Sequence, residues 1–304
     1  MGEKILVTNY ETGKEKPYRV PFEIKLLMLR SKVIREAALS LGTNPALQKY
    51  VGNSWPIKKN NFSENHERTH HANGENIPVL PSDGYLTRSE ISEEGISTVL
   101  GHLEIDIKRM LGLTQLTEEP LDPAFQNEME GSLGNLKGGQ HDLAILKPRH
   151  KHCCTVPFKS TVKNIYRVGK DGSILPDKIV DNKIHEEKYS TDPKFSRENP
   201  DLHIFDGNQR MVFVLETEID GKPMEYTMVA HAAAFVSGIE SLVNKGQEIS
   251  PKTPLFNFHQ GSSLSTIWPK EFHEKFQSRK KIEEKTTNNK VLEVLEGQVI
   301  YEGV

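Results

Sequence analysis

Cysteine is nearly absent from this chain of 304 residues: there are two, Cys153 and Cys154, and they are adjacent. Neighbouring cysteines rarely bridge each other because the small ring that they would close is strained, so the sequence excludes a disulfide framework. A chain without disulfides suits a reducing compartment, and we therefore expect a cytoplasmic protein.

Long apolar runs are also lacking. No stretch of about 18 apolar residues occurs, so we expect no membrane-spanning helix. Residues 1–20 contain no apolar signal-peptide core, and we expect no export by that route. A myristoylation signal is incomplete, because Leu6 stands where serine or threonine is needed. Any association with a membrane is expected to be peripheral.

Charge of one sign is not in excess. The chain has 39 basic and 42 acidic residues, and its formal net charge is −3. Nucleic-acid-binding proteins usually carry a strong basic surface, so we expect no nucleic-acid partner. At this length and with 36% hydrophobic residues the chain can bury a substantial core. Its oligomeric state stays open, a homo-oligomer included.

Helical periodicity is found in three stretches of the sequence. Residues 21–42 carry apolar side chains at helical spacing, and Gly42 suits a helix C-terminus. Similar patterns predict helices over about 92–113 and through the charged tail 270–300, which we expect to end in a short strand. The Asn-rich stretch 57–76 is polar and predicts a loop or linker.

The period changes to that of strands from about residue 141. Asp220-Gly221 separates two of these runs, and this dipeptide is a strong β-hairpin signal. The predicted strands are HDLAIL (141–146), STVKNIYRV (160–168), RMVFVLETEI (210–219) and MEYTMVAHAAAFV (224–236).

These patterns predict an α+β fold, with N-terminal helices packed on a largely antiparallel β-sheet core. We divide the chain into a helical extension with a polar linker, residues 1–76, and one larger domain, residues 77–304. No internal repeats occur.

Histidine is plentiful, with 12 in the chain, and this raises the question of a metal site. His66, His70 and His71 lie close together in HERTHH, and RHKHCC covers 149–154. The first tract is polar without apolar periodicity, and no second ligand pair at recognisable spacing completes either site. We therefore expect no metal.

A glycine and two serines interrupt the apolar alternation in FNFHQGSSLSTIWPK, residues 256–270. The motif around Ser262 is not the G-x-S-x-G of a nucleophile elbow, and it lacks the lysine and glycine spacing of a phosphate-binding loop. From the residues alone, Ser262 is either a turn serine or a nucleophile of another kind, and the turn is favoured.

Four stretches together resemble the phosphatidylserine decarboxylase family of pyruvoyl-dependent enzymes. They are similar to the family's S-P-A-D-G segment, its L-x-P-R-D-Y-H-R-x-H-x-P segment, its N-E-R strand with the following V-G-S-I-E segment, and its ending K-G-x-E-x-G-x-F-x-x-G-S-T. In the same order they are VLPSDGYL (79–86), ILKPRHKHCCTVP (145–157), residues 207–243 and residues 244–263.

The resemblance implies that the chain cuts itself between Gly261 and Ser262. The Ser262 hydroxyl would attack the preceding carbonyl, elimination would leave dehydroalanine, and its hydrolysis would give a pyruvoyl cofactor. The product would be a heterodimer of a β chain, 1–261, and an α chain, 262–304. The pyruvoyl ketone would then form a Schiff base with the substrate amine and withdraw electrons as carbon dioxide leaves.

The resemblance also suggests roles for single residues. Asp83 matches the aspartate that orients the self-cleavage base, and His152 matches a histidine implicated in decarboxylation. Asn208 and Arg210 match the N-E-R segment and are expected to bind substrate. Thr155 falls where the family has the histidine that activates the serine, and threonine cannot act as a base at neutral pH.

Another group must then serve Ser262, and His150, His231 and His259 are candidates beside His152. Within the family, phosphatidylserine is the commonest substrate and is taken as the default, while soluble branches decarboxylate free amino acids such as tryptophan. A homologue that binds but never cuts itself is the alternative from another class, and Thr155 is its best support.

Overall fold

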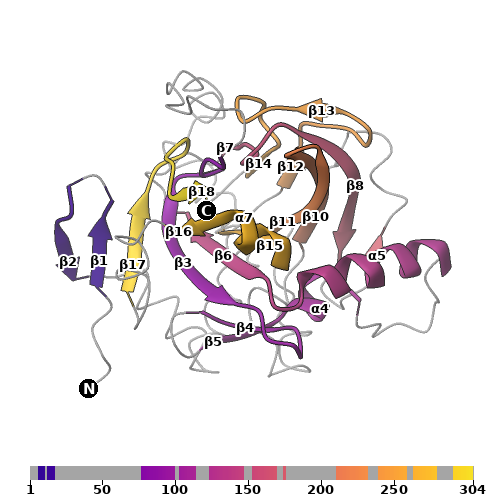
Figure 1. Cartoon of the computed structure of the whole chain (residues 1–304), viewed down its shortest axis with the longest axis horizontal. Helices are drawn as coiled ribbons and strands as arrows, with labels where there is room; N and C mark the ends of the chain where they lie inside the picture. Colours follow the sequence, from indigo (N-terminus) through magenta and orange to yellow (C-terminus); the bar gives the residue numbers. More distant parts are fainter. Residues whose placement is uncertain are drawn as a thin grey trace, which may run out of the picture.

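The computed structural model describes part of the chain, and Figure 1 shows its arrangement. Strands dominate this part, and the helices are few and mostly short. The described residues are 6–10, 12–17, 77–99, 103–113, 123–146, 153–169, 174–175, 210–231, 239–258, 263–278 and 290–303.

One eleven-stranded sheet forms the centre of the molecule. Its pairs are antiparallel except for β1 with β17, which confirms the largely antiparallel sheet expected from the sequence. Its order is β13 (Glu248–Ile249), β8 (Ser160–Val168), β10 (Arg210–Ile219), β11 (Lys222–His231), β15 (Ser263–Trp268), β6 (Gln140–Ile145), β3 (Gly84–Glu90), β17 (Lys290–Val294), β1 (Leu6–Asn9) and β2 (Glu15–Pro17), with β9 (Ile174–Leu175) beside β8.

Smaller elements cover the two faces of this sheet. Three small sheets are formed by β12 (Ile239–Ser241), β14 (Phe256–Phe258) and β7 (Cys153–Cys154), by β16 (Phe276–Ser278) and β18 (Tyr301–Gly303), and by β4 (Ile96–Val99) and β5 (Leu103–Asp106). The helices within the described ranges are α4 (Ile107–Met110), α5 (Pro123–Leu136) and α7 (Lys270–Lys275).

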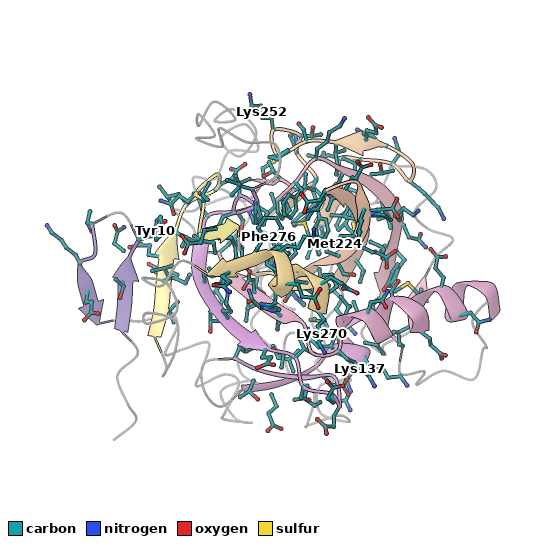
Figure 2. All side chains as sticks on the ribbon, in the orientation of Figure 1. Tyr10, Lys137, Met224, Lys252, Lys270 and Phe276 are labelled. Atoms are coloured by element: carbon teal, nitrogen blue, oxygen red, sulfur yellow. The ribbon has the colours of Figure 1, made fainter. Side chains whose placement is uncertain are left out.

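Each face of the large sheet buries a separate apolar core, because side chains alternate between the faces along every strand. The first core joins the sheet to β7, β12, β14, α7, β16 and β18. The second core joins the other face to α4, α5, β4 and β5. Met224 and Phe276 belong to the first core and lie among crowded side chains in Figure 2, whereas Lys252 projects from the periphery.

The hairpin predicted at Asp220-Gly221 is confirmed. Strands β10 and β11 pair along their whole length, and the last pair is Ile219 with Lys222. Both turn residues have positive φ, 52° for Asp220 and 72° for Gly221, as a two-residue type I′ turn requires. The predicted strands at 141–146 and 160–168 are also confirmed as β6 and β8.

Two predicted helices are wrong over most of their described length. Residues 92–99 and 103–113 contain the antiparallel strands β4 and β5 and only four residues of helix. Gly95 turns the chain with φ of 82°, and the β-branched Ile96, Thr98 and Val99 follow, which favours a strand over a helix. The helix in the tail ends at Lys275, because the next residues pair with β18.

The predicted helix at 21–42 and the linker at 57–76 lie outside the described residues. The described residues form a domain that is mostly β-sheet with few helices, which is compatible with the predicted α+β fold. The packing of N-terminal helices on the sheet stays a prediction. Within the described ranges, no helix has the length and apolarity needed to cross a membrane.

Candidate functional site

The first two stretches of the family resemblance meet in space. The backbone N–H of Thr155 donates to the carbonyl oxygen of Pro81 at 2.9 Å, and the Thr155 hydroxyl lies 3.5 Å from the same oxygen. The N–H of Val79 donates to the carbonyl of Pro157 at 3.1 Å. The residue that stands in place of the family's histidine is therefore packed directly against the loop that carries Asp83.

Asp83 is buried and holds the start of β3 to the C-terminal part of the chain. Its Oδ1 accepts the backbone N–H of Glu296 at 2.9 Å. The loop before β3 also forms two backbone hydrogen bonds with the turn at 295–298. Leu80 N–H donates to Gln298 O, and Gly297 N–H donates to Leu80 O, both at 2.9 Å. This carboxylate thus has a fixed position, while its predicted role in orienting a base stays a prediction.

The proposed cleavage site lies between two different sheets. Strand β14 ends at Phe258 and pairs with β7, whereas β15 begins at Ser263 inside the large sheet. Ser263 is in register with Ile145 of β6 on one side and with His231 of β11 on the other. The strand before the proposed cleavage site is thus the central strand of the small sheet, and the strand after it lies in the middle of the large one.

Several predicted site residues lie outside the described part of the chain, and their roles stay predictions. These residues are His150, His152, Asn208, His259, Gly261 and Ser262.

Arg210 is completely buried at the start of β10. Its guanidinium donates hydrogen bonds to the carbonyl oxygens of Met110 and Arg109, at the end of α4. Cations favour the C-terminal end of a helix, where carbonyl groups lack helical partners. These contacts are typical of a structural arginine, and substrate binding by Arg210 stays a prediction.

His231 is the one replacement-base candidate within the described ranges. It ends β11, is 1% exposed, and lies in register with both Arg210 and Ser263. Its Nε2 is 2.8 Å from the hydroxyl of Ser265, two residues further along β15. The sequence suggested this histidine as a candidate, but it did not indicate this hydroxyl partner.

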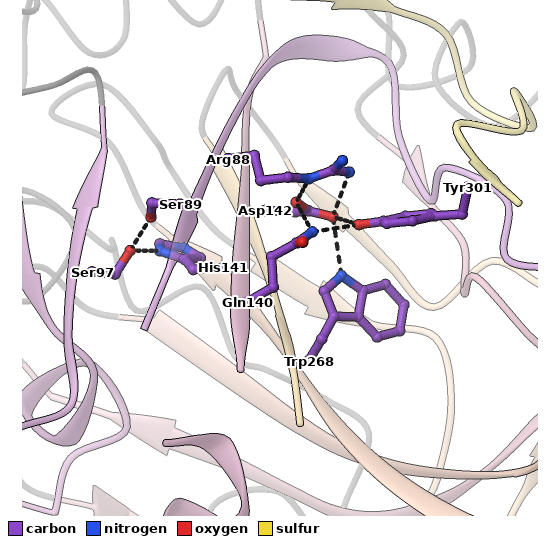
Figure 3. A network of polar contacts seen from close by, with 8 residues as sticks. All are labelled: Arg88, Ser89, Ser97, Gln140, His141, Asp142, Trp268 and Tyr301. Carbon is purple, nitrogen blue, oxygen red and sulfur yellow. Dashed lines mark hydrogen bonds and ion pairs between the residues drawn. The ribbon is translucent and has the colours of Figure 1, made fainter. Parts of the chain in front are cut away.

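Sequence reasoning missed a row of buried polar residues that continues from His231. The Ser265 hydroxyl also lies 2.7 Å from Nε2 of His141, whose Nδ1 lies 2.7 Å from the Ser97 hydroxyl. Ser97 in turn contacts Ser89 at 2.5 Å (Figure 3). We call Ser89, Ser97, His141, Ser265 and His231 the His–Ser chain.

His141 is fully buried within the His–Ser chain. Burial disfavours the charged imidazole and lowers its pKa to about 4, although the neighbouring carboxylate of Asp142 acts in the opposite direction. At neutral pH His141 is therefore uncharged. It has one nitrogen that donates a hydrogen bond and one that accepts.

A second polar group occupies the opposite face of the same strands. The Asp142 carboxylate accepts from Arg88 Nε at 2.7 Å, Gln140 Nε2 at 2.8 Å and Trp268 Nε1 at 3.0 Å, and also from the Tyr301 hydroxyl. We call these five residues the Asp142 cluster (Figure 3). Burial raises the pKa of Asp142, but the Arg88 charge and these hydrogen bonds outweigh that effect, so the pKa lies below its usual value.

A small pocket lies on the first-core face, next to the Asp142 cluster. The loop before β3 and the strand after the cleavage site both line it, through Ser82 and Leu264 among others. The Ser82 hydroxyl is buried and has no hydrogen-bond partner among the described residues.

Metal-ligating side chains do not gather anywhere in the described ranges as groups of three or more. Cys153 and Cys154 are buried thiols in β7. The histidine tract at 66–71 and residues 149–152 lie outside the described part.

Comparison with known proteins agrees with this geometry. A search of curated proteins found no match. The sequence model of the family described as phosphatidylserine decarboxylase matches residues 60–291, which is most of the chain and includes the Pro81 loop, β6, β11 and β15. The chain therefore belongs to the phosphatidylserine decarboxylase family.

Proposed function

We propose that this protein is a pyruvoyl-dependent decarboxylase that makes its own cofactor by cutting the bond between Gly261 and Ser262. One observation supports this most strongly. The segments that resemble the family are far apart in the sequence, but they pair with the strands before and after that bond: β7, next to Thr155, pairs with β14, and β6 and β11 pair with β15.

His231 is the base that we assign to self-cleavage. A serine hydroxyl needs a proton acceptor before it attacks a carbonyl, and Thr155 cannot supply one. His231 lies opposite Ser263, the residue directly after the proposed nucleophile. Its imidazole is held by Ser265, as a base is commonly held by a third group.

The two products of the cut are expected to stay together. The α chain would begin at residue 262, and its first strand, β15, lies between β6 and β11 of the β chain. Backbone hydrogen bonds on both edges of β15, and the burial of Leu264 and Trp268, would hold it in the sheet. The mature enzyme would thus be a heterodimer of residues 1–261 and 262–304.

The pyruvoyl group, once formed, supplies a ketone that withdraws electrons from the substrate as the substrate's carboxylate is released as carbon dioxide. The residues around it would bind the substrate and move protons. We assign proton transfer to His152 and substrate binding to Asn208. Ser82 would donate a hydrogen bond in the pocket. Asp83 would fix the loop that carries Ser82.

The substrate class is an α-amino carboxylate with an unblocked amine. Phosphatidylserine is the default within this class, since the family is named for it. A free amino acid has the same reacting groups and is the alternative. A lipid substrate would require peripheral contact of the cytoplasmic protein with a membrane.

Intact mass measurement tests the self-cleavage. The wild-type chain should give a large fragment that ends at Gly261 and a small one whose first residue is chemically blocked. Ser262→Ala should abolish the cut, and the matched control Ser263→Ala should leave it. A wild-type chain that stays whole, with Ser262 unmodified and no carbon dioxide release, would contradict the proposal and favour a binding homologue.

Borohydride trapping distinguishes the two substrates. Phosphatidylserine in mixed vesicles and free tryptophan are each incubated with the mature enzyme, and the mass of the α chain is then measured. The mass increase identifies the amine that was bound. Flotation with the same vesicles tests membrane contact separately.

A further inference from the structure

The His–Ser chain crosses the interior on the second-core face of the large sheet. Ser97, His141 and Ser265 are 0% exposed, and His231 is 1% exposed. Ser89, at the other end, is half-buried. The chain therefore connects the strand end beside Ser263 with a point close to solvent.

The single hydroxyl proton of Ser265 constrains both imidazoles. Ser265 lies within 2.8 Å of both Nε2 atoms, and its hydroxyl can donate to only one of them. If both rings carried a proton on Nε2, the buried hydroxyl proton would lose its acceptor, which costs about 1–3 kcal/mol. Neutral His141 and His231 are therefore expected to use Nε2 in opposite ways, one as donor and the other as acceptor.

Two complete proton arrangements follow from this constraint. In the first, His231 Nε2–H donates to Ser265, Ser265 donates to His141, and His141 Nδ1–H donates to Ser97. In the second, Ser97 donates to His141 Nδ1, His141 Nε2–H donates to Ser265, and Ser265 donates to His231 Nε2. When His231 Nδ1 takes up a proton, a shift from the first to the second passes the Nε2 proton towards Ser89, and both rings end neutral, with the proton of His231 on Nδ1.

We propose that the His–Ser chain is a proton relay that returns His231 from its charged to its neutral form during self-cleavage. This inference rests on the proposed function. His141 and Ser265 act through His231 and are positioning residues.

The proton balance of self-cleavage calls for such a relay. In the first step the Ser262 hydroxyl oxygen bonds to the Gly261 carbonyl carbon, the C–N bond breaks, and the hydroxyl proton passes through the base to the nitrogen. In the second step the Cα–H of residue 262 loses its proton, its electron pair forms Cα=Cβ, and the Cβ–O bond breaks to release the Gly261 carboxylate. One proton then remains on the base until the dehydroalanine is hydrolysed, a step that takes up water, leaves the pyruvoyl ketone and releases ammonia.

Retaining that proton on a buried ring is unfavourable. Burial penalises a charged imidazole, as the low pKa of His141 indicates. Proton exchange through hydroxyl groups avoids a charged ring at the centre of the domain, and the half-buried Ser89 lets the proton reach water.

Imidazole nitrogen spectroscopy tests the proton arrangement independently of activity. The full-length Ser262→Ala chain, labelled with ¹⁵N-histidine, should show one of the two rings protonated on Nε2 and the other on Nδ1. Ser265→Ala should change the nitrogen signals of both rings. The control Ser132→Ala removes a hydroxyl on the same face, bonded to Glu225 of β11, and should change neither. Protons on Nε2 of both rings would overturn the relay.

Cutting rates test the role in self-cleavage. Precursors are made by a pulse of cell-free translation and followed on denaturing gels. Ser265→Ala should slow the cut by about 100-fold or more, as expected for loss of a proton-transfer group. Ser265→Thr keeps the hydroxyl and should cut within a few-fold of wild type, which a purely structural role for a small side chain would not predict.

The outcomes separate the two proposals. A wild-type precursor that never cuts overturns the proposed function and the relay with it. Cutting by Ser265→Ala at the wild-type rate overturns the relay alone. The imidazole spectrum of each variant also reports whether its fold is kept.

Discussion

Two polar groups lie back to back on strands β3 and β6, and their chemistry is opposite. His141 and Asp142 are neighbours on β6, so their side chains point to opposite faces of the sheet. The Asp142 cluster contains a buried ion pair, in which each oxygen of the carboxylate accepts fixed donors. The His–Ser chain is made of neutral imidazoles and hydroxyls.

The difference shows what each kind of network can do. A buried carboxylate with a guanidinium and three further donors has one proton arrangement, so it holds elements together and does not exchange protons easily. Hydroxyls and neutral imidazoles donate and accept equally well, so the same contacts allow two arrangements. We therefore expect the Asp142 cluster to govern stability and the His–Ser chain to govern proton transfer.

Removal of the charge on Asp142 should have the largest effect on stability. Asp142→Asn leaves the guanidinium of Arg88 buried without its carboxylate, and loss of one partner of a buried pair costs about 3–5 kcal/mol. The exposed pair Lys163–Glu216 is the matched control, and Glu216→Gln should cost less than about 1 kcal/mol. Urea denaturation of the Ser262→Ala chain measures both. Equal costs would contradict the distinction between the pairs.

The next effect is the pH dependence that His141 brings. The unfolded chain protonates this ring near pH 6.5, while the folded chain does so near pH 4. Between these values the unfolded state binds more protons, so the free energy of unfolding falls with falling pH, by about 3 kcal/mol in total.

His141→Asn should flatten that slope in urea denaturation curves measured from pH 7 to pH 4. His273→Asn in α7 is the comparison: burial lowers the pKa of His273 in the same direction but by less, so this variant should flatten the slope less than His141→Asn does. A slope unchanged in His141→Asn would show that the ring is already charged in the folded protein.

Tyr301→Phe should weaken the Asp142 cluster without removing its charges. One hydrogen bond to a charged acceptor is lost, which costs about 1.5–3 kcal/mol. Because the pKa of Asp142 is depressed, its contribution is complete above about pH 3.9 and is lost as pH falls through the lower folded value. The variant raises that folded value, so acid unfolding should begin at higher pH.

Tyr226→Phe is the comparison for this variant, since its hydroxyl lies 2.8 Å from the neutral hydroxyl of Ser160. Its loss should cost about 1 kcal/mol, and the pH of acid unfolding should stay unchanged. Equal acid shifts in both variants would argue against a direct effect of Tyr301 on Asp142.

The smallest effect on stability is expected at the outer end of the His–Ser chain. Ser89 is half-buried, so water can replace its hydroxyl, and Ser89→Ala should cost less than about 1 kcal/mol. Ser97→Ala removes the buried partner of His141 Nδ1 and should cost about 1–3 kcal/mol. Thermal unfolding of both variants measures the difference, and a larger cost for Ser89→Ala would contradict this order.

Strand prediction succeeded where local signals agree with the tertiary structure. The β10–β11 hairpin has alternating apolar residues on both sides of a dipeptide suited to positive φ, and it forms as expected. Residues 92–106 have apolar residues that fit a helical spacing, but β-branched side chains and the pairing of β4 with β5 decide their conformation.

Family prediction succeeded for a different reason. The resemblance of four segments to one family is confirmed by the family match, while the roles that it suggests for Asp83, His231 and the Gly261–Ser262 bond stay predictions. It gave no indication of His141 or Ser265, because neither belongs to the motifs. An isolated histidine on an apolar strand and a serine on another have no distinguishing local pattern.

The sequence by itself determined the strand alternation, the hairpin at Asp220-Gly221 and the family, since these depend on neighbouring residues or on motif order. Only the tertiary structure decided that β15 lies between β6 and β11. That pairing brings Ser265 into contact with His141, 124 residues away, and with His231. Strand order in a sheet depends on the burial of both faces of the whole domain, and no local segment carries that information.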